Sequence, residues 1–470
     1  MNDTSNDSTN YDYDMIVIGS GPSGQKAAVQ AAKLKKRVAV IEMANVVGGI
    51  WSNSGTIPSK SFREAVMYLS GFRERSIYGS AYRVKSRISM ADLTFRIESI
   101  VRHENQVIED QLSRNRIEIL RGKASFVGPH QVMIEGESGI TTKTGRVIVI
   151  AVGTRPFHPP GFEVDGEKVL DSDDVLTMKD LPRNLTVVGG GIIGCEYASM
   201  FAVLGVKVTI VEVRKELMSF VDREIVEALQ YHLRNLGITL RLGEEVSQVV
   251  RRSDDQVETS LKSGKKITSD TVLVSAGRQG ATENINLMLV GIEADKYGRI
   301  KVNEHYQTAV PHIYAVGDVI GFPALASTGM KQGRSAACHA FDLPDETENV
   351  PLPYGIYTIP EISLVGESED SLTEKQIPYE TGISRYKEIA RGHLIGDELG
   401  MLKILFHRET RQILGVHIIG EGATEIVHLG QAVMHLKGGL EYLMACVFNN
   451  PTLTECYKVA ALDGLNKIRA

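Results

Sequence analysis

The sequence predicts an α/β fold in which two β-α-β domains of similar design are accompanied by a C-terminal α+β domain. Two observations lead to this prediction: a strand–glycine turn–helix–strand pattern occurs twice, and the composition changes from about residue 351. The chain has 470 residues, and a chain of this length is expected to form about three domains rather than one hydrophobic core.

The first pattern occupies residues 13–42. Tyr13 to Ile18 is a short β-branched apolar run typical of a buried parallel strand, and Gly19-Ser20-Gly21-Pro22-Ser23-Gly24 follows it directly. A helix is predicted over Gln25–Lys35, and a strand over Arg37 to Ile41 ends in Glu42. In this G-x-G-x-x-G context Gly19, Gly21 and Gly24 allow a pyrophosphate to approach the helix N-terminus, and Glu42 can bind a ribose. A glycine turn alone occurs in many α/β folds, but the complete unit predicts a Rossmann-like dinucleotide-binding domain.

The second pattern repeats this design over residues 185–212. Leu185 to Val188 is the strand, Gly189, Gly191 and Gly194 mark the turn, Cys195 to Leu204 is the helix, and Val206 to Val211 ends in Glu212. Two complete patterns predict two bound dinucleotides; the alternative is a duplication with one empty copy. Glu212 would favour the free 2′-hydroxyl of NAD, whereas Arg214 and Lys215 could contact the 2′-phosphate of NADP, although surface cations are common.

The stretch from Gly48 to Lys60 resembles the active-site segment of the flavoprotein disulfide reductases. That segment reads G-G-x-C-x-N-x-G-C-I-P-S-K, and here Trp51 and Thr56 stand at its two cysteine positions. The resemblance implies an FAD site that includes Gly49 and Thr56.

Three further motifs resemble the same family. Gly153-Thr154-Arg155-Pro156 resembles the point where the chain leaves the FAD domain, and Gly277-Arg278 resembles the point where the chain returns to it. In Ile313 to Asp318 the resemblance makes Asp318 the acceptor of a flavin hydroxyl; the plainer interpretation is a turn-capping aspartate.

These resemblances imply a domain order. We expect a disordered tail at 1–10, an FAD-binding domain at 11–155 that resumes at 281–350, an NAD(P)-binding domain at 156–280 and an interface domain at 351–470.

Within these domains the sequence predicts single elements. Helical patterns cover 61–72 and 91–115. Residues 117–150 suggest a small antiparallel insertion, and 146–152 forms another buried strand. Strands are expected at 401–406 and 413–418, and a last helix at 452–466. The interface domain implies a homodimer or a higher homo-oligomer.

The disulfide reductases take a catalytic histidine from an H-P-T-x-x-E segment near the C-terminus. The corresponding stretch here is Asn450-Pro451-Thr452-Leu453-Thr454-Glu455. An amide cannot exchange a proton near neutral pH, so Asn450 cannot act as the base. Both thiols and the base are therefore missing, and a dithiol–disulfide reaction is not expected.

Two charged positions of the reduction site are kept. Lys60 ends I-P-S-K and Glu196 follows the second glycine turn, and the resemblance implies that they pair beside the flavin, where a fixed cation favours the developing negative charge. Taken singly, Lys60 could be a solvated helix residue and Glu196 a helix N-terminal acid.

A flavin that accepts hydride from one nicotinamide could return it to another, and residues 12–468 resemble the soluble pyridine nucleotide transhydrogenases. The hypothesis is ping-pong hydride transfer between NADPH and NAD at one site, with FAD as cofactor. Two alternatives stay open: an NAD(P)H oxidase or quinone reductase, and a non-catalytic nucleotide-sensing flavoprotein.

Composition excludes several other classes. A net charge of −6 without a clustered basic stripe argues against nucleic-acid binding, and no run approaches the roughly 20 apolar residues that cross a bilayer. The polar, acidic start lacks the features of a signal peptide, so a cytoplasmic protein is expected. Cys195, Cys338, Cys446 and Cys456 have no C-x-x-C or C-x4-C spacing, which supports neither a zinc ribbon nor a local dithiol. A disulfide between distant positions stays open, but a reducing cytosol favours buried free thiols.

Overall fold

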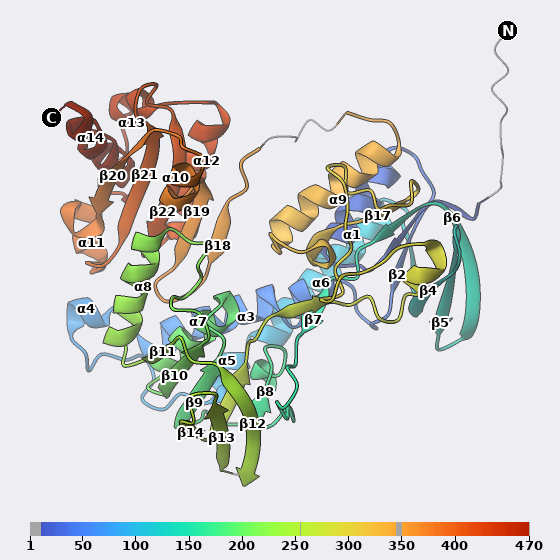
Figure 1. Ribbon diagram of the computed structural model, residues 1–470, viewed down its shortest axis with the longest axis horizontal. Helices are drawn as coiled ribbons and strands as arrows, with labels where there is room; N and C mark the ends of the chain where they lie inside the picture. The colour runs from blue at the N-terminus through green and yellow to red at the C-terminus, as the bar shows by residue number, and fades with distance from the viewer. Residues whose placement is uncertain (1–10, 254, 345–349, 470) are drawn as a thin grey trace. The chain divides into compact units, whose positions relative to one another are not determined.

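The computed structural model describes residues 11–253, 255–344 and 350–469 (Figure 1). The chain divides into two compact units. The first contains Met1–Ser59, Arg96–Phe157 and Arg278–Glu348, and the second contains Lys60–Phe95, His158–Gly277 and Asn349–Ala470. The tail expected at 1–10 lies outside the described residues.

A mixed sheet forms the centre of the first unit. Its strands follow the order β3 (Glu118–Arg121), β2 (Val38–Glu42), β1 (Tyr13–Ile18), β6 (Gly139–Ile150), β5 (Gln131–Gly136) and β4 (Lys123–Gly128), and β17 (Ile313–Ala315) also pairs with β6. β3, β2, β1, β6 and β17 are parallel, whereas β4, β5 and the first half of β6 are antiparallel. β1 is buried almost throughout, as its β-branched apolar sequence predicts.

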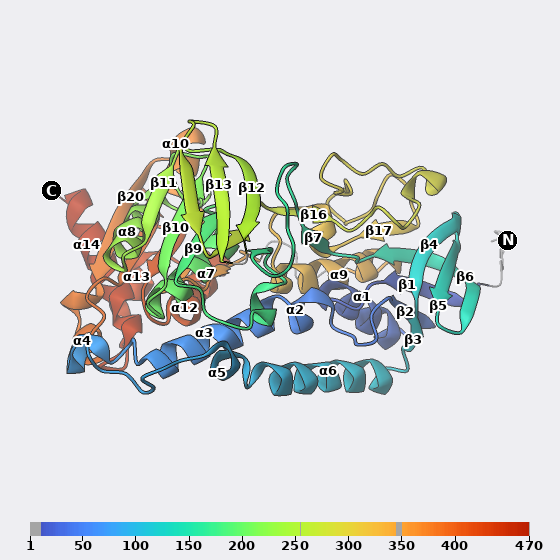
Figure 2. The ribbon, with the colours of Figure 1, turned by 90° about the horizontal axis from the view of Figure 1, so that it is seen from below.

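Helices cover one face of this sheet. α1 (Pro22–Lys33) and α9 (Ala326–Ala340) lie side by side (Figure 1), and α6 (Ile97–Arg114) packs beside α1 (Figure 2). A β-carbon added at Gly333 of α9 would lie 2.0 Å from the Ser23 carbonyl oxygen of α1, so this glycine permits the close packing of the two helices. The unit also contains α2 (Gly49–Asn53), the β7–β16 ribbon (Thr154–Pro156 and Arg278–Gly280), and the 3₁₀ turns η2 (Leu287–Val290) and η3 (Gly317–Ile320).

The nucleotide-binding part of the second unit is a parallel sheet. Its order is β11 (Thr239–Leu242), β10 (Lys207–Glu212), β9 (Asn184–Val188), β15 (Thr271–Val274) and β8 (Val169–Leu170). α7 (Ile192–Val203) packs on β9 and β10. An antiparallel sheet of β12 (Val246–Ser253), β13 (Gln256–Leu261) and β14 (Lys266–Ser269) lies beside it (Figure 2). The other elements before β18 are α3 (Thr56–Ser70, in this unit from Lys60 onward), α4 (Arg75–Tyr78), α5 (Met90–Thr94), η1 (Val175–Thr177) and α8 (Arg223–Asn235).

The C-terminal part of the second unit is an antiparallel sheet flanked by helices. The strand order is β18 (Tyr354–Ile356), β19 (Ile362–Gly366), β22 (Ile413–Ile419), β21 (Met401–His407) and β20 (Tyr379–Arg385). A separate apolar core forms between this sheet, α12 and α14. Its helices and 3₁₀ turns are α10 (Glu369–Glu374), η4 (Tyr386–Glu388), α11 (Ala390–Ile395), α12 (Ala423–His435), α13 (Leu440–Ala445), η5 (Leu453–Glu455) and α14 (Cys456–Arg469).

The predicted α/β class is confirmed, but three local predictions need correction. The helix expected over 91–115 is two helices: a capping box of Ser89 and Asp92 starts the short α5, and a turn at residues 95–96 separates α5 from α6. Within 117–150 the expected antiparallel strands are present as β4, β5 and the first half of β6, but β3 joins the parallel sheet, and the strand expected at 146–152 is the end of the twelve-residue β6. The last helix, expected from 452, begins at Cys456, after a 3₁₀ turn.

Among the described residues, no helix combines the length and apolarity needed to cross a membrane.

Candidate active site

The first glycine turn joins β1 to α1 and leaves space at the helix N-terminus. A β-carbon at Gly24 would lie 2.0 Å from the carbonyl oxygen of Gly19, whereas one at Gly21 would meet nothing within 4 Å. Gly24 therefore permits the close approach of helix and strand, and Gly21 faces open space. Because the N–H groups of a first helical turn have no intrahelical partner, this space suits an anion such as a pyrophosphate.

Glu42 lies at the end of β2 and organises this turn. Its buried carboxylate accepts hydrogen bonds from Ser20 N (3.1 Å), Ser20 Oγ (2.5 Å) and Ala44 N (2.9 Å). Ser20 Oγ in turn accepts one from Gly48 N at 2.9 Å, which ties the turn to the Gly48-Gly49 segment. A carboxylate accepts about four hydrogen bonds, so room for a ribose hydroxyl is left on Glu42. The sequence did not indicate this internal role.

The Gly317-Asp318 signature lies beside the same turn. A β-carbon at Gly317, whose φ is +79°, would lie 2.5 Å from Ser23 Oγ in the first turn of α1. Gly317 N also donates to Gln332 Oε1 at 2.8 Å, a partner that sequence reasoning missed. Burial raises the pKa of Asp318, and the Arg278 guanidinium and the Thr154 hydroxyl oppose that rise. The structure thus brings together two motifs that are almost 300 residues apart in the sequence.

The segment from Gly48 to Lys60, which has Trp51 and Thr56 at the family's two cysteine positions, is held in place by amide side chains. Asn53 Nδ2 donates to the carbonyl oxygens of Val47 (2.9 Å) and Gly49 (2.8 Å), and its Oδ1 accepts from Asn105 Nδ2 at 2.9 Å. Trp51 is half-buried against the core under the α1 face, and Thr56 is exposed. A β-carbon at Gly49 would lie 3.1 Å from the α-carbon of Gly21, so this segment adjoins the first glycine turn.

The second glycine turn, between β9 and α7, repeats the geometry of the first. A β-carbon at Gly194 would lie 2.0 Å from the carbonyl oxygen of Gly189, and one at Gly191 would meet nothing within 4 Å. Gly153 and Gly277 have φ values of +66° and +118°, respectively, which favour glycine, and a β-carbon at either would meet nothing within 4 Å.

Glu212 ends β10 and binds Arg214. Its Oε1 accepts from Arg214 Nε (2.9 Å) and Arg214 N (2.9 Å), and its Oε2 accepts from Arg214 Nη2 (3.2 Å) and Gly190 N (2.6 Å). Burial acts to raise the pKa of Glu212, but the hydrogen bonds from Arg214 and Gly190 outweigh it and hold that pKa below its usual value. The two residues that the sequence assigned to opposite nucleotide preferences are therefore partners.

Lys60 and Glu196 form an ion pair within the second unit. Lys60 Nζ lies 2.6 Å from Glu196 Oε2, and the Lys60 side chain is 25 % exposed whereas that of Glu196 is 6 % exposed. Glu196 Oε1 accepts from the backbone N of Tyr357 at 2.8 Å. The sequence predicted the pair, but gave no sign of Tyr357, which lies in the C-terminal part of the chain.

Asn450 and Glu455 occupy the positions of the family's histidine and glutamate. Asn450 Nδ2 lies 2.9 Å from both carboxylate oxygens of Glu455. The Asn450 amide thus donates hydrogen bonds to Glu455, but it neither gains nor loses a proton near neutral pH and cannot act as a general base.

Comparisons with known proteins agree with this geometry. A family model described as pyridine nucleotide-disulphide oxidoreductase matches residues 13–333, and its dimerisation-domain model matches residues 352–461. A soluble pyridine nucleotide transhydrogenase of Mycobacterium tuberculosis is 53 % identical over 461 residues, which is 98 % of each chain. One of Colwellia psychrerythraea is 44 % identical over 470 residues, covering 97 % of this chain and 99 % of that one. The chain belongs to the soluble pyridine nucleotide transhydrogenase family.

Solved structures of the wider superfamily share the fold of this transhydrogenase-family chain. The HOCl-induced flavoprotein disulfide reductase RclA from Escherichia coli is 25 % identical, with a TM-score of 0.86 over 96 % of this chain and 99 % of that one. LpdA from M. tuberculosis is 24 % identical, with a TM-score of 0.88 over 95 % of this chain and 99 % of that one, a likeness of fold alone. The family models and the two transhydrogenase relatives confirm the family predicted from the sequence.

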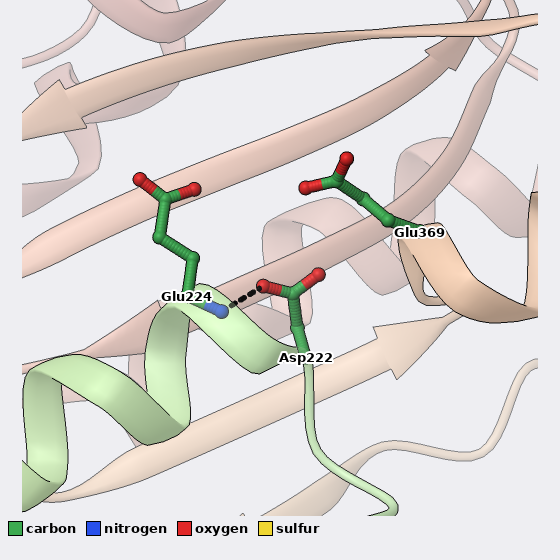
Figure 3. A group of neighbouring side chains, drawn as sticks. All are labelled: Asp222, Glu224 and Glu369. Carbon is green, nitrogen blue, oxygen red and sulfur yellow. Dashed lines mark hydrogen bonds between the residues drawn. The ribbon is translucent and has the colours of Figure 1, made fainter.

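One further group of charged residues lies in the second unit. Asp222, Glu224 and Glu369 have carboxylate oxygens within 4.8 Å of one another (Figure 3). The buried ammonium of Lys403 lies among them, 3.0 Å from Asp222 Oδ1 and 3.1 Å from Glu224 Oε2, and it also contacts Glu369. Lys403 therefore supplies the cation at this group, which connects α8 and α10 with β21.

Proposed function

We propose that this transhydrogenase-family chain is an FAD-dependent enzyme that transfers hydride between NADPH and NAD⁺ in a ping-pong cycle. The observation that carries the proposal is the Lys60–Glu196 ion pair, kept in a chain that has Trp51, Thr56 and Asn450 where a disulfide reductase has two thiols and a base. Bound FAD would supply the hydride carrier, because a flavin can accept hydride from one nicotinamide and return it to another.

The residues proposed to hold FAD belong to the first unit, where Gly21 faces open space and Asp318 lies beside the same turn. The proposed set is Gly19, Gly21, Gly24, Glu42, Gly49, Thr56, Gly153 and Asp318. In the second unit the open space at Gly191 supports a nucleotide site formed by Gly189, Gly191, Gly194, Glu212, Arg214 and Gly277. The domain boundaries expected from the sequence, 11–155, 156–280, 281–350 and 351–470, are part of this proposal, as are a homodimer and a cytoplasmic location.

In the proposed reaction, residues of the chain stabilise charge and do not transfer protons. Lys60, held by Glu196, is a fixed positive charge that would favour negative charge on a reduced flavin, a role that needs no base. The overall reaction, NADPH + NAD⁺ → NADP⁺ + NADH, releases and consumes no proton. The replacement of the histidine base by Asn450 is therefore compatible with turnover.

One nucleotide site must accept both substrates in turn. The Arg214 guanidinium can remain on Glu212 while NAD(H) is bound, or can move to the 2′-phosphate of NADP(H), because both partners suit its planar fork. We propose that this exchange of partners lets one site bind both nucleotides.

The test uses FAD-loaded protein under anaerobic conditions. NADPH is mixed with the protein while flavin absorbance is recorded, and NAD⁺ is added after bleaching is complete. Recovery of the absorbance with one NADH formed per flavin supports the proposal. Recovery only with oxygen or a quinone would instead identify an oxidase or quinone reductase, and no bleaching by NADPH or NADH would favour a nucleotide sensor.

A further inference from the structure

The loop Tyr357–Glu361, between β18 and β19, is fastened to the two helices that carry Lys60 and Glu196. Tyr357 N donates to Glu196 Oε1 at 2.8 Å, and Ile359 N donates to Ser199 Oγ at 3.1 Å, one turn further along α7. Ser199 Oγ itself donates to the carbonyl oxygen of Glu196 at 2.8 Å. The loop therefore fixes both the backbone and the side chain of Glu196.

The same loop is attached to α3. The Arg63 side chain, which is 2 % exposed, donates from Nε (3.4 Å) and Nη2 (3.3 Å) to the Thr358 carbonyl oxygen, and its guanidinium lies 3.3 Å from Glu361. Arg63 lies about one helical turn after Lys60 on α3. The loop is thus anchored next to both members of the ion pair, and all these residues belong to the second unit.

The Tyr357 ring faces the Lys60 ammonium. Nζ lies 4.9 Å from the ring centroid, within the range in which an aromatic face attracts a cation, and Glu196 Oε2 lies 2.6 Å from the same nitrogen. The ammonium is therefore held by a carboxylate and by an aromatic face. Burial raises the pKa of Tyr357, so the ring is a neutral phenol at physiological pH and not a second anion.

We propose that Tyr357 is a positioning residue for hydride transfer: its backbone N–H sets the Glu196 carboxylate, and its ring holds the Lys60 ammonium in the reactive position. This inference rests on the proposed function, in which Lys60 stabilises the charge that develops on hydride arrival. Tyr357 touches neither nucleotide in this account and acts through Lys60. The nearby sequence, Tyr354 to Ile362, is an ordinary strand–loop–strand and does not reveal this role.

The test is a double-mutant cycle between Tyr357 and Lys60 in FAD-loaded protein. Tyr357→Phe keeps the aromatic face, whereas Tyr357→Leu removes it and leaves the backbone N–H in place. For Tyr357→Leu we expect flavin bleaching at saturating NADPH to slow by roughly threefold to thirtyfold, as cation–π strengths imply. Tyr357→Phe should stay within about twofold, and the Kd for NADPH should change little in either variant, because neither alters a nucleotide contact.

A second readout separates positioning from general packing. The flavin midpoint potential should fall in Tyr357→Leu and in Lys60→Met, and adding Tyr357→Leu to Lys60→Met should lower it no further. FAD content and the thermal unfolding midpoint are measured for each variant. If Tyr357→Leu does not fold, Tyr357→Met, which also lacks an aromatic face, replaces it in the cycle.

The outcomes distinguish this inference from the function it rests on. Full additivity of the two substitutions, or a Tyr357→Leu protein that matches the wild type while Lys60→Met is slow, would overturn the role of Tyr357 and leave the proposed function intact. Wild-type bleaching and potential in Lys60→Met would instead remove Lys60 from the mechanism, and the inference would fail with it.

Discussion

Two glutamates at the ends of equivalent strands, Glu42 and Glu212, are bound in different ways. Glu42 accepts hydrogen bonds from Ser20 and from the backbone of Ala44, whereas Glu212 accepts a two-pronged contact from Arg214 and a bond from Gly190. At the residue scale, this difference supports the proposed roles, in which Glu42 binds one fixed cofactor and Glu212 belongs to a site that exchanges two nucleotides. In this proposal Arg214, whose side chain is 46 % exposed, moves between Glu212 and the 2′-phosphate.

Replacing Arg214 by alanine should therefore change nucleotide preference. Loss of one charge-assisted contact to the 2′-phosphate is expected to lower kcat/KM for NADPH by about 10- to 100-fold. The value for NADH should stay the same or rise, because the Glu212 carboxylate becomes available to the ribose. Steady-state kinetics with each donor measure the effect, and Arg234→Ala, at an exposed position in α8 outside the proposed nucleotide site, is the control. An equal loss with both donors would contradict the exchange of partners.

His417 is expected to make the stability of the protein depend on pH. It is buried in β22, its Nε2 contacts the Glu367 carbonyl oxygen at 2.8 Å, and among the described residues its Nδ1 has no hydrogen-bond partner. Burial lowers the pKa of His417, so the unfolded chain binds a proton below about pH 6.5 that the folded chain does not. Its contribution is complete above that pH and is lost as the pH falls toward the folded-state pKa.

His417→Gln should flatten the fall in unfolding free energy between pH 7 and pH 5, because glutamine keeps an N–H donor but cannot be protonated. Denaturant unfolding at each pH provides the measurement, with the exposed His435→Gln as the matched control. An unchanged pH profile in His417→Gln would show that other groups cause the fall.

At the scale of elements, the two strand–turn–helix units share one steric device. The third glycine of each turn, Gly24 in α1 and Gly194 in α7, would place a β-carbon 2.0 Å from the carbonyl oxygen of the first. Because that oxygen belongs to the backbone, the clash cannot be relieved by a side-chain rotation. A substitution at Gly24 or at Gly194 should therefore disrupt only the glycine turn to which that residue belongs.

Alanine at Gly24 and at Gly194 should give opposite phenotypes. We expect Gly24→Ala to be purified with little FAD, and Gly194→Ala to keep FAD but to show at least about a tenfold weaker reduction by NADPH, since each clash displaces one phosphate-binding helix N-terminus. Flavin absorbance per chain and anaerobic titration distinguish the two. FAD loss from Gly194→Ala with full occupancy in Gly24→Ala would reverse the assignment of the sites.

The group formed by Lys403 with Asp222, Glu224 and Glu369 connects elements of the second unit. Asp222 also caps α8 through Glu224 N at 3.1 Å, so the cluster joins the start of that helix to β21. Lys403→Met would leave three carboxylates close together without their cation, one of them buried. We expect a loss of about 3–5 kcal/mol in the free energy of unfolding, as for other broken buried pairs. Chemical denaturation measures it, and Lys387→Met, at an exposed position, should change little.

At the scale of the whole molecule, the chain has no thiol at the two positions where the disulfide reductases have their redox-active cysteines, because Trp51 and Thr56 stand there. Cys195, Cys338 and Cys456 are buried and Cys446 is half-buried, all as free thiols. Burial raises the pKa of Cys195 strongly and that of Cys456 to about 11, which leaves little reactive thiolate.

Transhydrogenase activity should therefore survive alkylation. Iodoacetamide added together with NADPH is expected to leave more than about 80 % of the activity, because only the partly accessible Cys446 can react. A dithiol-dependent disulfide reductase treated in parallel is the positive control. Rapid inactivation that requires NADPH would indicate an essential thiol, which Cys446→Ser would then identify or exclude.

The sequence by itself determined the two glycine turns, the acids that follow them, the loss of both cysteines and the histidine base, and hence the family. These features could be predicted because each depends on a few consecutive residues whose backbone conformation is set locally. The fold class followed for the same reason, although the extent of β6 and the break between α5 and α6 did not, since strand pairing and local turns decide where elements end. Only the tertiary structure showed that Tyr357 binds Glu196, that Gln332 holds Gly317 and that Lys403 lies among three carboxylates. Those partners are distant in the sequence, and packing alone selects which of many polar side chains meet.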